Sequence, residues 1–240
     1  IWYLCSMKNL REIDLAGLEE MFVALGEPKF RAQQVHDWVW QKYASDISDM
    51  TNLPKALREK LSTEFFIPKV RINHSQYSND GTIKNRLQLH DGFYVESVLI
   101  PTESRMTACV SSQVGCSLSC KFCATGYMAR KRNLDFDEIV DEVTLLNELA
   151  QKHYSKNLSN IVFMGMGEPL LNYKNTLKAI ERITSPDGLG MSPRRITVST
   201  AGVFAWTPSY TQAGTYAAVI TVSDGTDSAI LTLNITVTDV

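Results

Sequence analysis

Three cysteines lie within eight residues of one another at C-x3-C-x2-C spacing: Cys116, Cys120 and Cys123. Thiolates this close in sequence can sit on one loop and hold three irons of a [4Fe–4S] cluster, which leaves the fourth iron for a small molecule. A structural zinc site usually takes two separated pairs of Cys or His, and the chain has no second pair. Disulfides between such close thiols have poor geometry. The spacing therefore favours an iron–sulfur reaction site over a zinc site or buried thiols.

The residues around this motif resemble one family closely. From about residue 7 to residue 202 the chain is similar to the RlmN family of radical S-adenosylmethionine (SAM) RNA methyltransferases, and the similarity stops at Gly202. The cysteine motif alone would indicate only a superfamily, whereas an ordered set of matching stretches is specific. The matching stretches are Gly26–Arg31, Met50–Pro54, Val95–Pro101, Cys109–Cys116, Lys131–Leu134, Gly165–Pro169 and Val198–Gly202.

The resemblance implies two cofactors, a [4Fe–4S] cluster on the three cysteines and SAM on the open iron. Within Gly165-Met-Gly-Glu-Pro169, Gly167 lets the backbone approach a ligand, and Glu168 can accept hydrogen bonds from the SAM amino group. By itself the motif also suits a tight turn in which Pro169 opens a helix. Ser199 matches a SAM-contacting serine of the family, and its ordinary alternative is capping or backbone hydrogen bonding.

The resemblance also assigns two catalytic residues. Cys109 matches the cysteine that helps to resolve a covalent protein–RNA intermediate, and Glu96 matches the family's proton-accepting glutamate. Without the family, Cys109 would be a buried strand cysteine and Glu96 a solvated strand position. Both roles therefore rest on the resemblance.

The implied activity is methylation of adenine C2 in large-subunit ribosomal RNA and some transfer RNAs, with an electron donor such as flavodoxin. The same motifs support the related methylation at adenine C8, so this alternative stays open. We expect a cytoplasmic monomer. We also expect no membrane span, because no apolar run is long enough to cross a bilayer. The clusters at 130–132 and 194–195, and Lys84 with Arg86, are candidate phosphate contacts, although such clusters are more often solvated surface.

Apolar periodicity predicts an α/β protein preceded by a small helical domain. Apolar residues recur at helical spacing over 7–74, and alternation over 75–101 predicts strands. Strand and helix patterns then alternate, which predicts parallel strands with function at their carboxyl ends. The strands are expected near 106–112, 161–166 and 195–200, and the helices near 135–153 and 173–184. With the resemblance, residues 75–202 become the first half of a radical SAM (β/α) partial barrel.

Residues 203–240 differ in composition from the rest. They contain no Lys, Arg or Glu and three of the 26 acidic residues, so the first 202 residues carry 24 basic against 23 acidic side chains. Alternating Thr and β-branched residues on both sides of Asp224-Gly225 predict a β-hairpin, which we expect either to lie against the open sheet edge or to be poorly ordered. Trp206 and Tyr216 make the segment similar to the last strands of a cadherin-like or immunoglobulin-like sandwich module. We therefore predict a β-rich module fragment at 203–240, and a non-native leader at 1–6.

One family residue has no counterpart in this chain. The family uses a second cysteine, near its carboxyl terminus, to accept a methyl group before the radical step, whereas the last cysteine here is Cys123. The chain as given is therefore expected not to complete RNA methylation. A non-catalytic surface or adhesion fragment is the alternative from another class, and only residues 203–240 support it.

Overall fold

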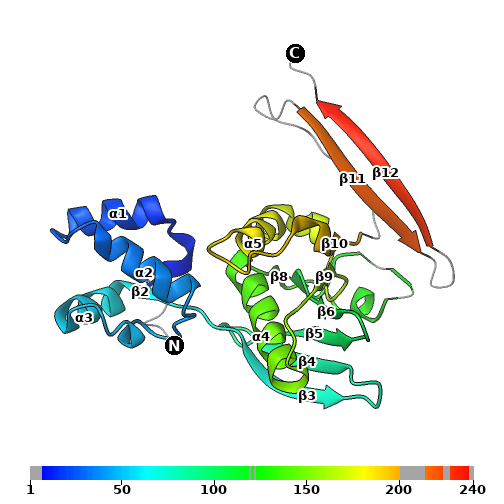
Figure 1. Ribbon diagram of the computed structural model, residues 1–240, viewed down its shortest axis with the longest axis horizontal. Helices are drawn as coiled ribbons and strands as arrows, with labels where there is room; N and C mark the ends of the chain where they lie inside the picture. Colours follow the sequence, from blue (N-terminus) through cyan, green and yellow to red (C-terminus); the bar gives the residue numbers. More distant parts are fainter. Residues whose placement is uncertain (1–6, 119, 122, 201–213, 224–227, 238–240) are drawn as a thin grey trace.

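The molecule consists of a helical amino-terminal part, a mixed sheet covered by helices, and a separate two-stranded hairpin (Figure 1). The computed structural model describes residues 7–200 except 119 and 122, and also the strands at 214–223 and 228–237. The predicted leader at 1–6, Trp206 and the Asp224-Gly225 turn lie outside the described residues.

The amino-terminal part is confirmed as helical. Its elements are β1 (Lys8–Asn9), η2 (Leu10–Glu12), α1 (Leu15–Ala24), α2 (Phe30–Trp40), η3 (Ile47–Asp49), α3 (Lys55–Glu64) and β2 (Phe65–Phe66). The Asp14 side chain accepts a hydrogen bond from the Gly17 N–H at 2.8 Å and so caps α1. The apolar positions of the helical pattern form a core that includes Leu18, Phe22, Val35 and Leu61.

Six strands form one mixed sheet in the order β10-β9-β6-β5-β4-β3. They are β3 (Arg71–Tyr77), β4 (Ile83–Gln88), β5 (Tyr94–Pro101), β6 (Met106–Cys109), β9 (Asn160–Phe163) and β10 (Ile196–Val198). Strands β3 to β6 are antiparallel neighbours, and the first two turns between them contain Gly81 and Gly92 at φ of 86° and 88°. Strands β6, β9 and β10 pair in parallel, which confirms the predicted parallel core.

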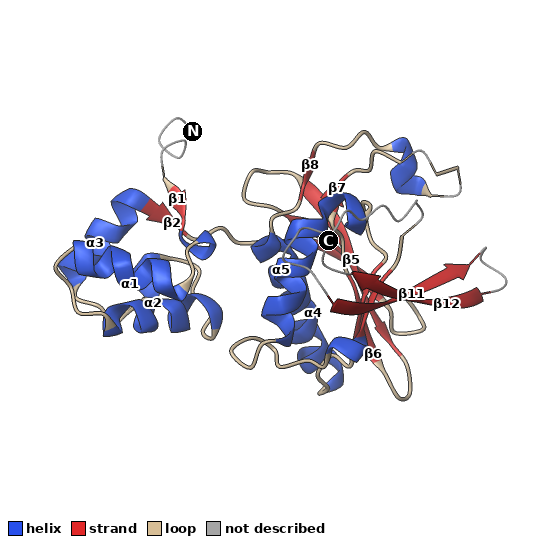
Figure 2. Ribbon diagram, turned by 90° about the horizontal axis from the view of Figure 1, so that it is seen from above, coloured by secondary structure: helices blue, strands red, loops and turns tan. Residues whose placement is uncertain are grey.

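Helices α4 (Phe136–Tyr154) and α5 (Tyr173–Thr184) connect the parallel strands and cover one face of the sheet (Figure 2). Alternate residues of β4 and β5 are buried, as period-two patterning predicts. The buried members include Ile83, Leu87, Val95 and Leu99. The residues between them, such as Lys84 and Glu96, lie on the open face. Within the described part of the chain, no helix is long and apolar enough to cross a membrane.

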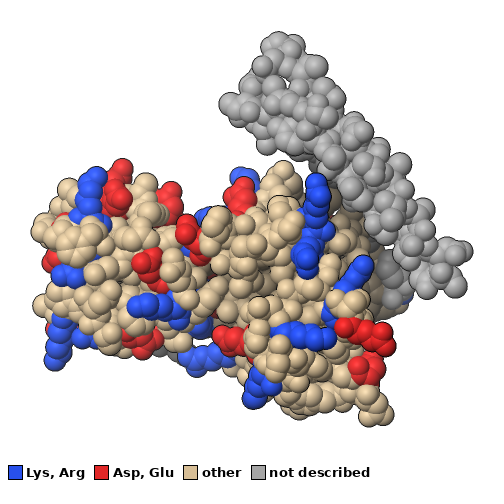
Figure 3. Space-filling model, viewed as in Figure 1, with Lys and Arg blue, Asp and Glu red and all other residues tan. Residues whose placement is uncertain are grey.

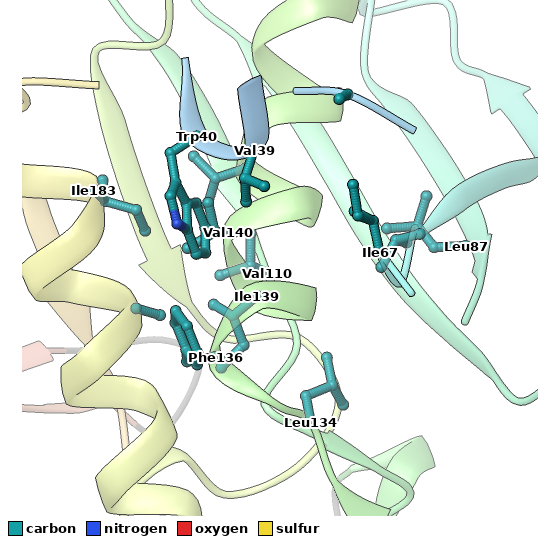
Figure 4. Close-up of a cluster of buried hydrophobic side chains, with 14 of the residues drawn as sticks. Val39, Trp40, Ile67, Leu87, Val110, Leu134, Phe136, Ile139, Val140 and Ile183 are labelled. Carbon is teal, nitrogen blue, oxygen red and sulfur yellow. The ribbon is translucent and has the colours of Figure 1, made fainter. Parts of the chain in front are cut away.

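One hydrophobic cluster joins the helical part to the sheet (Figure 4). Trp40 of α2 packs against Phe136 at the start of α4, with ring centroids 5.6 Å apart. A buried ion pair joins Arg11 to Asp141 of α4 at 2.7 Å, and the second oxygen of Asp141 accepts the Val70 N–H at 3.0 Å. Apolar and charged contacts therefore dock the two parts together.

The predicted hairpin is confirmed. Strands β11 (Gly214–Ser223) and β12 (Ser228–Val237) pair antiparallel along their whole length. Among the described strands they pair only with each other, as a sheet of their own. The likeness of this segment to sandwich modules stays a prediction.

Candidate functional site

The three motif cysteines lie on a loop that leaves the sheet after β6 and returns beside its own start. At its base, β7 (Gln113–Val114) pairs antiparallel with β8 (Arg132–Asn133), and Cys116 bridges to Ala129. Gly115 has a φ of +74°, and a Cβ added there would collide with the Ala129 carbonyl. Residue 115 must therefore be glycine for the loop to close.

Within this loop, the thiols of Cys116, Cys120 and Cys123 are free and partly exposed. The Cys123 N–H donates to the Cys120 carbonyl at 3.1 Å, and the Leu118 N–H donates to Cys116 Sγ at 3.4 Å. Three soft sulfur ligands on a closed loop fit iron–sulfur chemistry. The described residues hold no group of three His, Cys, Asp or Glu side chains already gathered for a metal, so the cluster ligands stay a prediction.

The Gly165–Pro169 motif lies at the carboxyl end of β9, against the start of the cysteine loop. Gly167 has a φ of +95°, and an added Cβ would lie 2.5 Å from the Cβ of Gln113. The Glu168 N–H donates to Gln113 Oε1 at 2.9 Å, and the buried Glu168 carboxylate accepts the Leu170 N–H at 3.2 Å. The motif is therefore fixed both by close packing and by hydrogen bonds.

Ser111 connects this motif to two other elements. Its N–H donates to Glu142 Oε2 on α4 at 3.0 Å, and its hydroxyl donates to the Glu96 carbonyl on β5 at 2.6 Å. The same hydroxyl accepts the Met166 N–H of the motif at 2.9 Å. One fully buried serine therefore fixes a helix, a strand and the strand-end turn relative to one another.

Glu142 is a carboxyl group completely buried on α4. Its Oε2 accepts the Ser111 N–H, while its Oε1 has no hydrogen-bond partner among the described residues. Burial raises the pKa of Glu142 well above its usual range, and the Ser111 N–H opposes this only in part. Burial therefore favours the protonated form of this carboxyl group.

Glu96 and Cys109 occupy the open face of the sheet. Cys109 on β6 pairs in register with Val98 on β5, which makes Glu96 its diagonal neighbour on that face. The Glu96 carboxylate forms an ion pair with Lys84 at 2.9 Å, and both side chains are about half exposed. Burial raises the pKa of the Cys109 thiol to about 11, so Cys109 is protonated at neutral pH.

Ser199 follows β10 and is half-buried. Because β6, β9 and β10 are parallel, their carboxyl ends meet at one edge of the sheet. The structure thus brings the cysteine loop, Gly167 with Glu168, and Ser199 to the same edge, with Cys109 and Glu96 beside it on the open face.

The basic residues predicted as phosphate contacts are dispersed. Arg132 donates to both oxygens of Glu138, at 2.7 and 2.8 Å, and to Asp91 at 2.6 Å, so its guanidinium has structural partners. Lys84 pairs with Glu96. On the face in Figure 3, Lys and Arg alternate with Asp and Glu and form no single basic patch.

The sequence did not single out Ser111 or Glu142. Ser111 lies inside the matching stretch Cys109–Cys116, but nothing in its neighbourhood marks it as a connecting residue. Glu142 carried a usable signal, because it lies on the apolar face of its helix with Ile139 and Leu146. A lone carboxyl group on such a face needs a partner.

Two known domains match the chain. Residues 8–67 match the ribosomal RNA large subunit methyltransferase N-terminal domain, and residues 110–212 match the radical SAM superfamily. A probable dual-specificity RNA methyltransferase RlmN from Christiangramia forsetii is 54% identical over 205 residues, which cover 84% of this chain and 58% of that protein. The chain belongs to the RlmN family.

Other relatives agree with the RlmN assignment. A dual-specificity RNA methyltransferase RlmN from Solidesulfovibrio magneticus is 48% identical over 198 residues, covering 82% of this chain and 56% of that protein. The crystal structure of a radical SAM methyltransferase from Sphaerobacter thermophilus has a TM-score of 0.71 at 40% identity, covering 81% of this chain and 57% of that one. The predicted radical SAM-like α/β fold is confirmed, and this RlmN-family chain spans a little over half the length of these relatives.

Proposed function

We propose that this chain carries the cluster-binding and SAM-binding machinery of an RNA methyltransferase acting on adenine. One observation carries the proposal: the closed three-cysteine loop and the Gly165–Pro169 motif meet at the carboxyl edge of the parallel strands. In folds of this kind, ligands bind at that edge. Membership of the RlmN family supplies the reaction class.

Cys116, Cys120 and Cys123 would hold a [4Fe–4S] cluster through their thiolates, leaving one iron for the amino and carboxylate groups of SAM. When bound, the cluster supplies the electron that splits SAM into methionine and a carbon radical. The loop itself contributes closure at Gly115 and the Leu118 N–H directed at the Cys116 sulfur. Both features orient the first ligand before any metal arrives.

Gly167, Glu168 and Ser199 would bind SAM. The absence of a side chain at Gly167 lets the backbone turn lie flat against Gln113, which leaves the motif in one conformation. The Glu168 carboxylate, which accepts the Leu170 N–H, is an acceptor of the kind that the SAM amino group would bind. The Ser199 hydroxyl, one strand away, offers a further polar contact.

Glu96 would accept a proton and Cys109 would resolve the covalent intermediate with RNA, as the family resemblance implies. Their shared open face supports these roles, since RNA must reach both side chains. Cys109 rests as a neutral thiol, so it must lose its proton before it can attack. The Lys84 ion pair holds the Glu96 carboxylate in place on that face.

The proposed substrates are adenine C2 of large-subunit ribosomal RNA and of transfer RNA, with a flavodoxin-type electron donor. We place a monomeric protein in the cytoplasm, because its proposed RNA substrates are there. We propose four segments with these bounds: a non-native leader at 1–6, a helical domain at 7–74, the first half of the radical SAM partial barrel at 75–202 and a β-rich fragment at 203–240.

Anaerobic reconstitution tests the cluster ligands. We expect about one [4Fe–4S] cluster per chain from iron and sulfide analysis, and loss of most iron in Cys116→Ala, Cys120→Ala and Cys123→Ala, because each removes one of three ligands. Cys109→Ala is the matched control and should keep the cluster. If Cys120→Ala kept full iron while Cys109→Ala lost it, the proposed ligand set would be wrong.

A further inference from the structure

A cavity of about 260 Å³ lies between the amino-terminal helical part and α5, and the proposed function does not use it. Its wall includes Arg11, His36, Trp40, Phe136, Lys178 and Arg182, which come from η2, α2, α4 and α5. One water occupies about 30 Å³ of liquid volume, so the cavity has room for a small polyatomic ion together with several waters.

Hydrogen-bonding groups without partners are concentrated at this cavity. Nine buried side-chain nitrogen or oxygen atoms of the described residues have no hydrogen-bond partner, and five of them belong to three residues of this wall. They are Nε and Nη2 of Arg11, Nε and Nη2 of Arg182, and Nδ1 of His36. Such atoms are rare in native proteins, and each calls for an unseen water or ion.

Carboxylates satisfy the basic groups at the base of the cavity only in part. Arg11 is 2% exposed, and only its Nη1 is paired, with Asp141 at 2.7 Å. Burial lowers the pKa of Arg182, and Arg11 lowers it further, while Asp187 opposes both. Burial and then Arg182 lower the pKa of His36. Besides burial, Arg182 therefore disfavours the charge of His36, and Arg11 disfavours the charge of Arg182; an anion between them would oppose both effects.

The carboxylates of the wall lie at its exposed rim. Glu12, Asp14 and Glu181 are exposed, whereas Arg11 and His36 are buried. Asp14 is also occupied as the cap of α1, where it accepts the Gly17 N–H. The base of the cavity is therefore cationic, although the wall as a whole contains both signs.

Aromatic rings account for the orientation of the guanidinium groups but not for their hydrogen bonds. The Cζ atoms of Arg11 and Arg182 lie 5.2 and 4.3 Å from the centre of the Trp40 ring. A ring face stabilises the positive charge of a cation above it. Guanidinium N–H groups point outward in their own plane, where an oxyanion can take two of them at once.

We propose that this cavity binds a phosphate group, held by Arg11 and Arg182 with His36 and Lys178. A phosphate offers several acceptor oxygens in different directions, which suits donors that come from three separate elements. The phosphate could belong to the RNA backbone or be free in solution. Bound there, it would join η2 and α2 to α5 and strengthen the docking of the helical part on the sheet.

A second, larger cavity gives a useful contrast. It measures about 800 Å³ and is also lined by basic residues, Lys69 and His90 among them. There the Lys69 amino group donates to the Tyr43 carbonyl at 2.7 Å, and His90 contacts Glu138 at 3.2 Å. Lys69 and His90 already have partners, and the third basic residue of this wall, Arg71, is exposed, so volume and basic residues alone do not mark a phosphate site.

Titration of the full chain with inorganic phosphate tests the proposal. We expect saturable binding by calorimetry and a phosphate-dependent rise in Tm, compared with chloride at equal ionic strength. Arg182→Gln should weaken phosphate binding at least about tenfold, the loss expected when a charge-assisted bidentate contact is removed. Lys178→Gln, at the exposed rim, should weaken it less and keeps the test valid if Arg182→Gln does not fold. The matched control Arg105→Gln, at an exposed arginine that does not line the cavity, should bind as the original chain does.

Failure of the proposal has a clear signature. Absence of saturable phosphate binding by the original chain would overturn it. So would phosphate binding by Arg182→Gln and Lys178→Gln that is as tight as that of the original chain. Competition with a short single-stranded RNA then distinguishes an RNA phosphate from free phosphate. If the site takes an RNA phosphate, Arg182→Gln should also weaken RNA binding. The slope of log K for RNA against log salt concentration should become shallower by about one. If RNA binding is unchanged while phosphate binding is lost, the site takes free phosphate. The result does not depend on the cluster, because none of these residues lies on the cysteine loop.

Discussion

The two halves of the candidate site are built in different ways. At the end of β9, Gly167 packs against Gln113, Glu168 is hydrogen-bonded to the same residue, and Ser111 holds the neighbouring backbone. The cysteine loop is closed at its base by Gly115 and the bridge from Cys116, but its sulfur atoms remain free and partly exposed.

The difference indicates which half depends on its ligand. Close packing and buried hydrogen bonds fix the strand-end turn in the absence of any cofactor, which keeps its conformational entropy low. In the cysteine loop, closure at Gly115 and the Leu118 N–H orient only Cys116, and metal bonds supply the remaining order in sites of this type. We therefore expect substitutions in the first half to unfold the protein, and substitutions in the second to remove only the cofactor.

The largest effect is expected for Gly167→Ala. A side chain at a φ of +95° is strained, and its Cβ would lie 2.5 Å from the Cβ of Gln113. Together, strain and overpacking should lower the free energy of unfolding by about 2–4 kcal/mol. Urea denaturation of the cluster-free protein measures this change.

Cys120→Ser is the matched loop variant for that measurement. Without cluster it should change the free energy of unfolding by less than about 0.5 kcal/mol, because the Cys120 side chain is partly exposed. Equal losses in the two variants would remove the distinction between a preformed half and a ligand-dependent half.

A smaller, pH-dependent effect is expected for Glu142. Its pKa is raised in the folded protein, so its stabilising contribution is complete below the ordinary pKa of 4.5 and falls as pH rises towards the folded pKa. Relative to Glu142→Gln, the original chain should lose up to about 1.4 kcal/mol per pH unit above pH 5. Glu142→Ala, which leaves the Ser111 N–H unpaired, should cost about 1–3 kcal/mol at pH 5.

Urea unfolding of the three proteins from pH 5 to 8 measures these differences. The raised pKa of Asp137, about 6, contributes a background of the same sign that cancels in the comparison. An identical pH dependence in the original chain and in Glu142→Gln would mean that Glu142 is ionised in the fold.

The elements were predictable because their signals are local. Helix α5 was expected at 173–184 and occupies those residues, and the parallel strands overlap the expected ranges, with β9 beginning one residue early at Asn160. The Ser111 network was not predictable, because its partners Glu96, Glu142 and Met166 lie 15, 31 and 55 residues away in sequence. Only the folded topology brings these residues together. The ion pair of Arg132 with Asp91 was not predictable for the same reason, since the two residues are 41 positions apart.

The smallest effect is expected from removing the hairpin. Strands β11 and β12 pair only with each other among the described strands, whereas every proposed cluster and SAM residue lies before residue 200. A chain ending at Gln212 keeps the whole radical SAM match at 110–212 and lacks both strands. Iron content and SAM affinity should then stay within about twofold of the original, because no proposed ligand has been removed.

Equilibrium dialysis with SAM under anaerobic conditions measures the affinity, with Cys120→Ala in the full-length chain as the cluster-free reference. A folded, iron-loaded truncation that no longer bound SAM would show that the hairpin belongs to the site, together with the strand-end turn and the cysteine loop.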